Sequence, residues 1–313
     1  MSRHAPRILL VTVAVIVAVV AVVAVVWFLF GPVSRWLAGP ELDQLDAKDR
    51  IAAMSTIRGQ VATVLSAAFV AGGLYYTGRK FVLDRDKQYT DRFTNAVDQL
   101  GSADVTVRAG GHRALDRILH DSARDRDRVL RTVTGYLRTH PVSQDKIPTP
   151  DDVAAALATI RDRGTPPRGR TDALDLRGIA IANADLSGFD LRDADLTGSD
   201  LTGADLRGAQ LPGARLDKAN LRDTNLTDAA LSGAHAAGVI LAGAVARGAD
   251  LSGCDLTKAD LTEIDLSDAD VDDAILVSAD LGGADLRSTR GLTDSQLRRA
   301  RVNPATSLPP ELG

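Results

Sequence analysis

The sequence predicts an α+β protein with two N-terminal transmembrane helices, a small helical module, and a repeat solenoid that ends in a capping helix. Three observations predict this order. Residues 8–30 carry no charged side chain, apolar positions recur at helical spacing between 84 and 163, and a five-residue repeat fills residues 174–288. Only 4% of the 313 residues are aromatic, so the core must be mainly aliphatic.

The first membrane helix is expected over residues 8–30, within an N-terminal domain of residues 1–80. At 1.5 Å per residue, these 23 residues reach about 34 Å, enough to cross a hydrocarbon core of about 30 Å. A signal peptide has a shorter apolar core of roughly 7–15 residues. We therefore expect a retained membrane helix.

A second membrane helix is expected over about residues 57–78. It ends in Tyr75 and Tyr76, followed by Arg79 and Lys80, an order typical of an aromatic belt and a basic anchor at a membrane interface. Its uninterrupted apolar part is only 16 residues long, so a buried soluble helix is the alternative. We favour a two-helix hairpin with the lipid bilayer as a partner.

The distribution of Lys and Arg predicts the orientation of this hairpin. Basic residues precede the first helix and follow the second, whereas the loop between them mixes both signs of charge. The bias favours a multi-pass cell-membrane protein with both termini in the cytoplasm. A one-helix topology would reverse the side on which all later residues lie.

The helical module is expected over residues 81–163, followed by a linker at 164–173. Four short apolar stripes mark four helices, and the last of them begins at Thr149, with Pro150 in its first turn. His112 and His120 are expected to be solvated or to cap a helix, because nothing nearby completes a metal site. The alternating charges of residues 124–128 indicate self-compensating surface charge rather than a nucleic-acid patch.

The repeat runs through 23 consecutive five-residue units without an insertion or deletion. The central residue of a unit is Leu in 19 units, Ala stands two positions before it in 15, and Asp lies between them in 13. In an extended chain, residues two apart face the same way, so Ala and Leu point inward and Asp points outward. The predicted structural core therefore includes Leu186, Leu196, Leu206, Leu256 and Leu286.

A period of five fits a short extended segment followed by a corner. Repeated corners close a polygon whose stacked turns lie about 4.8 Å apart, and many units are needed to bury such a core. The Ala-Asp-Leu sequences at 184–188, 204–208 and 259–263 resemble the A(D/N)LXX pattern of pentapeptide-repeat proteins. The resemblance implies a right-handed quadrilateral β-helix with four units per coil.

The ends of this β-helix need covers, because each is an open sheet edge. The helical module is expected to cover the first end. At the other end, Thr293 and Gln296 form a capping box that opens a short helix, and Leu292 is placed to staple it over the last coil. We assign residues 289–313 to this cap and tail. The layout as a whole resembles actinobacterial membrane-anchored members of the family.

No enzyme is predicted, and no catalytic, cofactor-binding or metal-binding residues are assigned. The sequence contains no Gly-rich phosphate loop, nucleophile elbow or His/Cys metal spacing. Residues 174–288 carry 21 acidic and 9 basic side chains. Some members of the family are acidic DNA mimics that bind gyrase, so the resemblance implies a type II topoisomerase as one alternative partner. We expect no direct binding of nucleic acid.

One predicted coil, residues 229–248, departs from the pattern. Its only Arg, Lys, Asp or Glu is Arg247, and its four outward positions are Ala, His, Ile and Val instead of Asp. We call His235, Ile240, Val245 and Arg247 the contact belt, because exposed aliphatic side chains favour association. Drift in a tolerant repeat is the alternative explanation. The leading hypothesis is a non-enzymatic, membrane-anchored scaffold that binds an unidentified protein or a second copy of itself.

Overall fold

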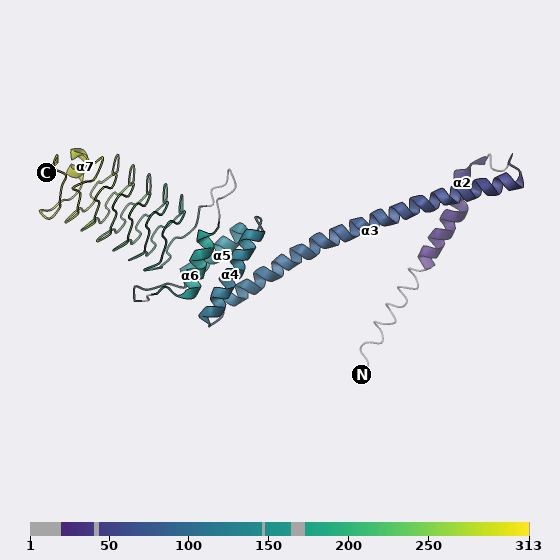
Figure 1. Cartoon of the computed structure of the whole chain (residues 1–313), viewed down its shortest axis with the longest axis horizontal. Helices are drawn as coiled ribbons and strands as arrows, with labels where there is room; N and C mark the ends of the chain where they lie inside the picture. Colours follow the sequence, from purple (N-terminus) through teal and green to yellow (C-terminus); the bar gives the residue numbers. More distant parts are fainter. Residues whose placement is uncertain (1–19, 41–43, 146–147, 164–172, 313) are drawn as a thin grey trace, which may run out of the picture. The chain divides into compact units, whose positions relative to one another are not determined.

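The computed structural model describes residues 20–40, 44–145, 148–163 and 173–312. The chain divides into two compact units, Met1–Lys87 and Gln88–Gly313. The helices in chain order are η1 (Leu29–Val33), α2 (Ser34–Ala38), α3 (Ala47–Leu100), α4 (Val105–Asp121), α5 (Arg126–Thr139), α6 (Asp151–Arg161) and α7 (Asp294–Arg299). Figure 1 labels α2 to α7.

The first apolar helix extends further than the sequence predicted. Residues 20–28 are helical and continue without a break through η1 and α2, so an end at residue 30 was wrong. Pro32 lies inside the π-helical turn, where the wider hydrogen-bonding pattern accommodates its missing N–H. The helix stops at Gly39, whose φ of 70° is left-handed. The predicted residues 8–19 lie outside the described residues.

The second apolar segment belongs to α3, which is 54 residues long. The predicted bounds of 57–78 were therefore wrong at both ends. At the start, Asp46 accepts a hydrogen bond from the backbone N–H of Asp49 at 2.8 Å, so residues assigned to the loop form the first turn. At the end, the charged residues after Lys80 contain no proline, and a change of composition alone does not stop a helix.

Two helical segments among the described residues, Val20–Ala38 and Ala47–Phe81, are long and apolar enough to cross a membrane, by length and composition alone. Within the first unit they line a shared apolar groove, which includes Val22 and Val26 on one segment and Leu65 and Phe69 on the other. Phe69 is 85% exposed. A surface of this kind matches a lipid environment.

The helical module packs the last two turns of α3 against α4, α5 and α6. The stripe around Phe93 was expected to form a separate short helix, but it is the C-terminal end of α3. Its buried partners include Leu115, Val133 and Ile160. The Arg128 guanidinium lies 3.8 Å from the centre of the Phe93 ring, so part of the alternating charge run holds α5 onto α3.

The repeat region forms a solenoid in which every coil takes 20 residues. Parallel bridges join each outward residue from Asp175 to Asp270 to the residue 20 positions later, as from Asp175 to Asp195 and from Ile240 to Asp260. Each face contributes single bridge residues, and the repeats contain no longer strand among residues 173–290. Figure 1 shows these coils stacked in chain order up to α7.

The module covers the first coil through hydrogen bonds. Val142 pairs with Ile181 in a parallel bridge, and Arg138 donates to the backbone oxygen atoms of Asp175 and Arg177 at 3.2 and 3.0 Å. Arg163 donates to the backbone oxygen of Asp190. These contacts satisfy backbone groups that a preceding coil would otherwise pair.

The last coil is covered by α7 and the segment that follows it. The predicted capping box forms, with reciprocal hydrogen bonds between Thr293 and Gln296. Arg301 and Ser307 then continue the ladder from Asp280 and Asp285. The backbone after α7 therefore replaces a further coil on two faces.

Candidate functional site

The outward Asp residues have a structural role. All fifteen Asp or Asn residues at that position of the 23 units accept a hydrogen bond from the backbone N–H two residues later, at 3.0–3.3 Å. This side chain closes the corner as an Asx turn does. The Asp or Asn of the A(D/N)LXX pattern is therefore explained by a local hydrogen bond, without a need for an acidic surface that binds a partner.

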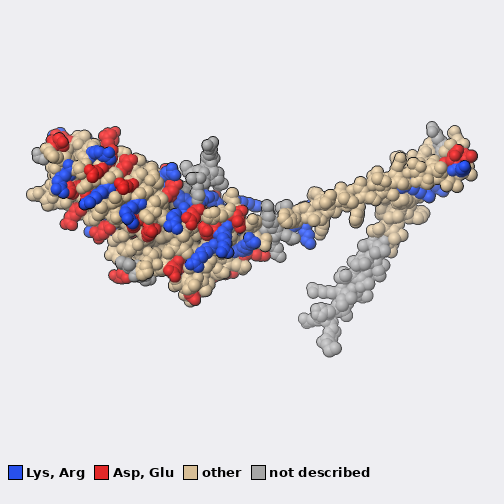
Figure 2. All heavy atoms as spheres, viewed as in Figure 1, with Lys and Arg blue, Asp and Glu red and all other residues tan. Residues whose placement is uncertain are grey.

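Several of these carboxylates are also paired with arginine. Arg207 and Arg287 form ion pairs with Asp205 and Asp285, each two residues earlier. A hydrogen bond from Arg177 holds the pKa of Asp175 at about 2. Figure 2 shows Lys and Arg interleaved with Asp and Glu over the repeat face in view. The face in view therefore carries both positive and negative side chains and is not a continuous acidic patch.

The belt lies in the C-terminal half of a longer stretch without outward carboxylates. Eight successive outward positions, from residue 210 to residue 245, hold Gln, Arg, Asn, Asn, Ala, His, Ile and Val. His235 and Val245 are exposed, and Ile240 is half-buried. On the face of His235 the bridges run from Asp195 through Arg215 and His235 to Asp255, so two coils separate the acidic bands.

Two arginines lie across or beside the belt. Arg222 approaches Asp260 at 3.9 Å, although the coil that carries Ile240 lies between them. Arg247 forms an ion pair with Asp265 on the next coil, and its own side chain is exposed. The belt is therefore apolar at Ile240 and Val245 and bordered by arginine.

The interior of the belt coil is filled by smaller side chains than its neighbours. Ala236 and Ala246 occupy centre positions and are each 1% exposed. The five leucines assigned to the structural core are buried, with exposures of 3% or less. Because Ala, Ile and Val offer no acceptor, three of the four belt corners also lack the Asx hydrogen bond. At the fourth, Asp217 accepts from the backbone N–H of Ala237 at 3.3 Å.

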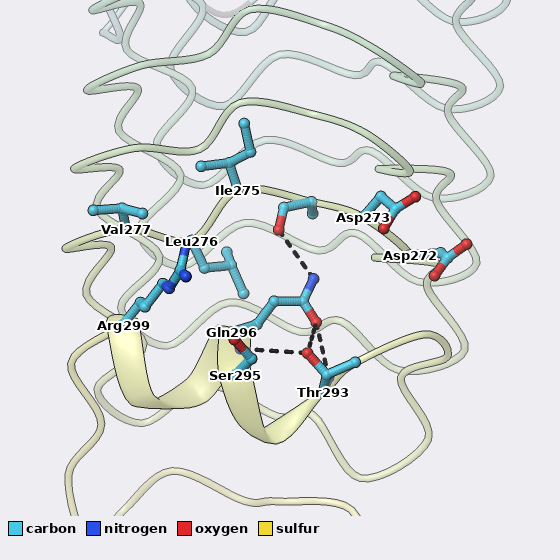
Figure 3. Close-up of a pocket in the computed structure, with 10 residues that line it drawn as sticks. Asp272, Asp273, Ile275, Leu276, Val277, Thr293, Ser295, Gln296 and Arg299 are labelled. Carbon is cyan, nitrogen blue, oxygen red and sulfur yellow. Dashed lines mark hydrogen bonds between the residues drawn. The ribbon is translucent and has the colours of Figure 1, made fainter.

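A pocket of about 290 Å³ lies between α7 and the last coil, and we call it the end pocket. Ile275 and Val277 line it together with Gln296 and Arg299. Figure 3 shows Arg299 and Val277 on one side and Asp272 and Asp273 on the other. Ile275 stands at an outward position and is 45% exposed. Ile275 is a single outward position without Asp, between Asp270 and Asp280, whereas the belt is a run of such positions. A site at Ile275 was therefore not predicted from the sequence.

The helical module contains a buried polar cluster that the sequence did not predict. The Asp152 carboxylate accepts hydrogen bonds from Arg108 at 2.7 Å and from the Tyr136 hydroxyl at 2.5 Å. Burial, then the hydrogen bond to Asp152, raises the pKa of Tyr136 to about 12. The three side chains tie α4, α5 and α6 together. Hydrophobic periodicity gave no signal for them because they lie on the apolar sides of their helices.

His112 is part of this buried region, so the expectation of a solvated or capping residue was wrong for it. Its side chain is fully buried, and neither ring nitrogen has a hydrogen-bond partner among the described residues. The ring packs edge-on against Tyr136 at a centroid distance of 4.5 Å. His120 is exposed, and its Nδ1 lies 2.9 Å from the backbone oxygen of Asp116 near the end of α4.

No group of three or more His, Cys, Asp or Glu side chains is arranged to hold a metal ion within the part of the chain that the structure describes. Cys254 is buried at an inward repeat position, and burial raises the pKa of its thiol to about 12. The thiol is therefore a small core side chain at neutral pH.

A family model described as pentapeptide repeats matches the chain in eight copies between residues 175 and 303. No curated protein sequence matches the chain. Among solved structures, HetL, a pentapeptide-repeat protein involved in heterocyst differentiation regulation in the cyanobacterium Nostoc, is 26% identical, with 43% of this chain and 72% of HetL covered and a TM-score of 0.23.

Two further solved structures are similar over the repeats. A pentapeptide-repeat protein of the Arabidopsis thaliana thylakoid lumen is 30% identical, with 34% of this chain and 72% of that protein covered and a TM-score of 0.24. Full-length QnrB1, a plasmid-mediated fluoroquinolone resistance protein, is 19% identical, with coverages of 42% and 82% and a TM-score of 0.24. On the match of the family model, together with the 20-residue coil, residues 175–303 of this chain are pentapeptide repeats.

Proposed function

We propose that this protein is a non-enzymatic, membrane-anchored scaffold whose solenoid binds a protein partner through the contact belt. The observation that carries the proposal is the composition of the belt coil. Three of its corners lack the Asx hydrogen bond, and two of its centres hold Ala instead of Leu. Such changes reduce stability. Contact of a partner with Ile240 and Val245 explains why the coil has this composition despite the loss of stability.

The backbone around the belt and the two apolar helical segments support the same proposal. A rigid ladder holds every belt residue at a fixed position, as the backbone N–H of Leu241 bonds to the Asp260 oxygen at 2.7 Å and that of Ala246 bonds to the Asp265 oxygen at 2.8 Å. Apolar side chains bordered by arginine are typical of protein interfaces. The two apolar helical segments supply the proposed anchor.

A topoisomerase-binding DNA mimic remains the alternative, with its support in the acidic excess of the repeats. Two features count against it. The outward carboxylates are absent from residue 210 to residue 245, and several of the others are paired with arginine. A duplex mimic needs acidic groups at regular spacing along the rod. The stretch from residue 210 to residue 245, which ends in the belt, interrupts that spacing for two coils.

The test is cross-linking in cells followed by affinity capture of the full-length protein. Wild type is compared with Ile240→Asp/Val245→Asp, which adds two outward carboxylates and gives both corners the Asx acceptor that the other coils have. The variant should fold at least as well as wild type. We expect wild type to capture a partner and the variant to lose it at least tenfold.

The matched control is Asn220→Asp/Asn225→Asp, one coil earlier on the same two faces. It adds the same charge while leaving the belt side chains in place, and it should keep the partner. If wild type and both variants capture the same proteins, the composition of the belt results from sequence drift and this proposal fails. Capture of gyrase would move the DNA-mimic alternative to first place, and capture of a second copy would identify a homodimer.

A further inference from the structure

The backbone ladder of the repeats is left open at one centre residue. Of the 23 centre residues in 174–288, 22 donate their backbone N–H to a backbone oxygen 19 to 21 residues later. Leu276 is the exception within these repeats, all of which the structure describes. Its residue is 4% exposed. A buried N–H group without an acceptor destabilises the folded protein unless a ligand supplies the acceptor.

The reason for the opening is the path of the chain after the last coil. The neighbouring centre residues Val271 and Leu281 find acceptors at Arg290 and Arg301. On the face of Ile275 the chain instead forms α7, whose Arg299 oxygen accepts from the Ser278 N–H at 2.8 Å. The Gln296 side chain reaches the Ala274 oxygen at 3.0 Å. Leu276 lies in the chain between these two contacts and is one of the residues that line the end pocket.

The substitution at Ile275 opens a second donor beside the first. Of the eight outward positions from 250 to 285, seven hold Asp, and Ile275 is the eighth. On the same face one coil earlier, Asp255 accepts from the Thr257 N–H at 3.0 Å. The equivalent donor here is the Val277 N–H, which has no acceptor within the described chain. Leu276 and Val277, which both line the end pocket, therefore have two successive backbone N–H groups without an acceptor in the described chain.

The side chains around these donors indicate the charge and shape of a ligand. Arg299 lines the same side of the end pocket as Val277, and Asp272 and Asp273 lie on the opposite side (Figure 3). A negative group is therefore favoured near Val277 and disfavoured at the other rim. The exposed Ile275 side chain offers an apolar surface beside the donors.

We propose that the end pocket binds a carboxylate carried by a small apolar group. The ligand carboxylate takes the place of the Asp that the repeat pattern puts at this position. It accepts from the Val277 and Leu276 N–H groups, Arg299 neutralises its charge, and the apolar group rests on Ile275. The same chemistry is offered by a free carboxylic acid and by the C-terminus of a protein chain that ends in an apolar residue.

The experiment uses the full-length protein in lipid nanodiscs and the probe N-acetyl-leucine. Only Val11 and Val277 follow a leucine in the sequence, so labelling Leu with carbonyl ¹³C and Val with ¹⁵N selects two amides for NMR. The resonance that moves in Ile275→Asp is assigned to Val277. N-acetyl-leucine should shift this resonance downfield in a saturable way. N-acetyl-leucinamide, which lacks the carboxylate, should bind at least tenfold more weakly.

The variant Ile275→Asp supplies an internal carboxylate to the Val277 N–H and should abolish binding, with the Val277 resonance already shifted in the free protein. Ile275→Leu keeps the pocket apolar and should bind like wild type. A peptide ending in Gly-Leu distinguishes the sources: tenfold tighter binding indicates a protein C-terminus, and equal binding indicates a free acid. No saturable shift, an equal response to the amide probe, or undiminished binding by Ile275→Asp would overturn the proposal.

Discussion

At the scale of single residues, the outward Asp contributes mainly through one oxygen. Asp255 accepts from the Thr257 N–H at 3.0 Å, and Asn220 makes the equivalent bond to Arg222 at 3.2 Å. We expect Asp255→Ala to lower the free energy of unfolding by about 0.5–1.5 kcal/mol. Asp255→Asn should stay close to wild type because its amide oxygen remains an acceptor.

Urea unfolding of both variants, followed by the exchange rate of the Thr257 amide, measures this difference. Equal losses in the Ala and Asn variants would show that charge, not the corner hydrogen bond, is what the position contributes.

The second residue-scale prediction concerns His112. Burial lowers its pKa to about 4, while nearby Asp152 raises it and His140 lowers it to smaller extents. The unfolded chain, with a His pKa near 6.5, takes up a proton first as the pH falls. Stability of the module is therefore lost between about pH 6.5 and pH 4, by about 1 kcal/mol between pH 7.5 and pH 5.5.

Hydrogen exchange of peptides from α4 to α6, corrected for the intrinsic effect of pH, tests this expectation. The variant His112→Leu should remove most of the slope over that interval. A wild-type slope that persists in the variant would assign the pH dependence to other groups.

The orientation and burial of a single residue could be predicted from the sequence only where the residue belongs to the five-residue repeat. The inward leucines and the outward Asp positions repeat every five residues, so their faces follow directly from the pattern. His112 and Asp152 belong to no period, and their burial results from packing between helices that are distant in sequence. Ile275 is visible in the sequence, but its importance depends on α7 leaving the Leu276 N–H unpaired.

At the scale of elements, the belt coil should be the least protected part of the solenoid. Its corners at Ile240 and Val245 lack the Asx hydrogen bond, and its Ala236 and Ala246 fill less of the core than leucine does. We expect backbone amides in residues 229–248 to exchange faster than those in 189–208 and 249–268, because opening this coil breaks fewer stabilising contacts.

Hydrogen exchange on wild type and on Val245→Asp checks this expectation. The variant gives the corner N–H of Arg247 an acceptor and should slow exchange in the coil. Uniform protection along the rod would mean that the ladder alone determines local stability.

The ends of the elements were harder to predict than their existence. The capping box at Thr293 carries its own local signal, and it forms as predicted. The start of α6 was predicted two residues too early. The helix was expected to begin at Thr149 with Pro150 in its first turn, but Pro150 is the N-cap and makes no side-chain cap bond. In α3 the polar residues after Lys80 keep helical backbone, because no residue there breaks the helix.

At the scale of the whole molecule, the distribution of chemistry separates three regions. The first unit exposes apolar side chains, the module buries a polar cluster, and the repeats carry the belt and the end pocket. The proposed sites at the belt and at the end pocket lie on different coils, so each can be removed without the other. A scaffold with two separable sites can join two partners at one surface.

The topology of the proposed anchor gives the last prediction. Cys254 is buried, so Cys254→Ala provides a background in which single introduced cysteines report on accessibility. We expect Leu45→Cys, between the two apolar helices, to react with a membrane-impermeant maleimide in intact spheroplasts. Ser2→Cys and Glu311→Cys should react only after the membrane is permeabilised, because the Lys and Arg distribution favours cytoplasmic termini. Labelling of Glu311→Cys but not of Ser2→Cys in intact spheroplasts would establish the one-helix topology, and release of the protein by alkaline carbonate would contradict the anchor itself.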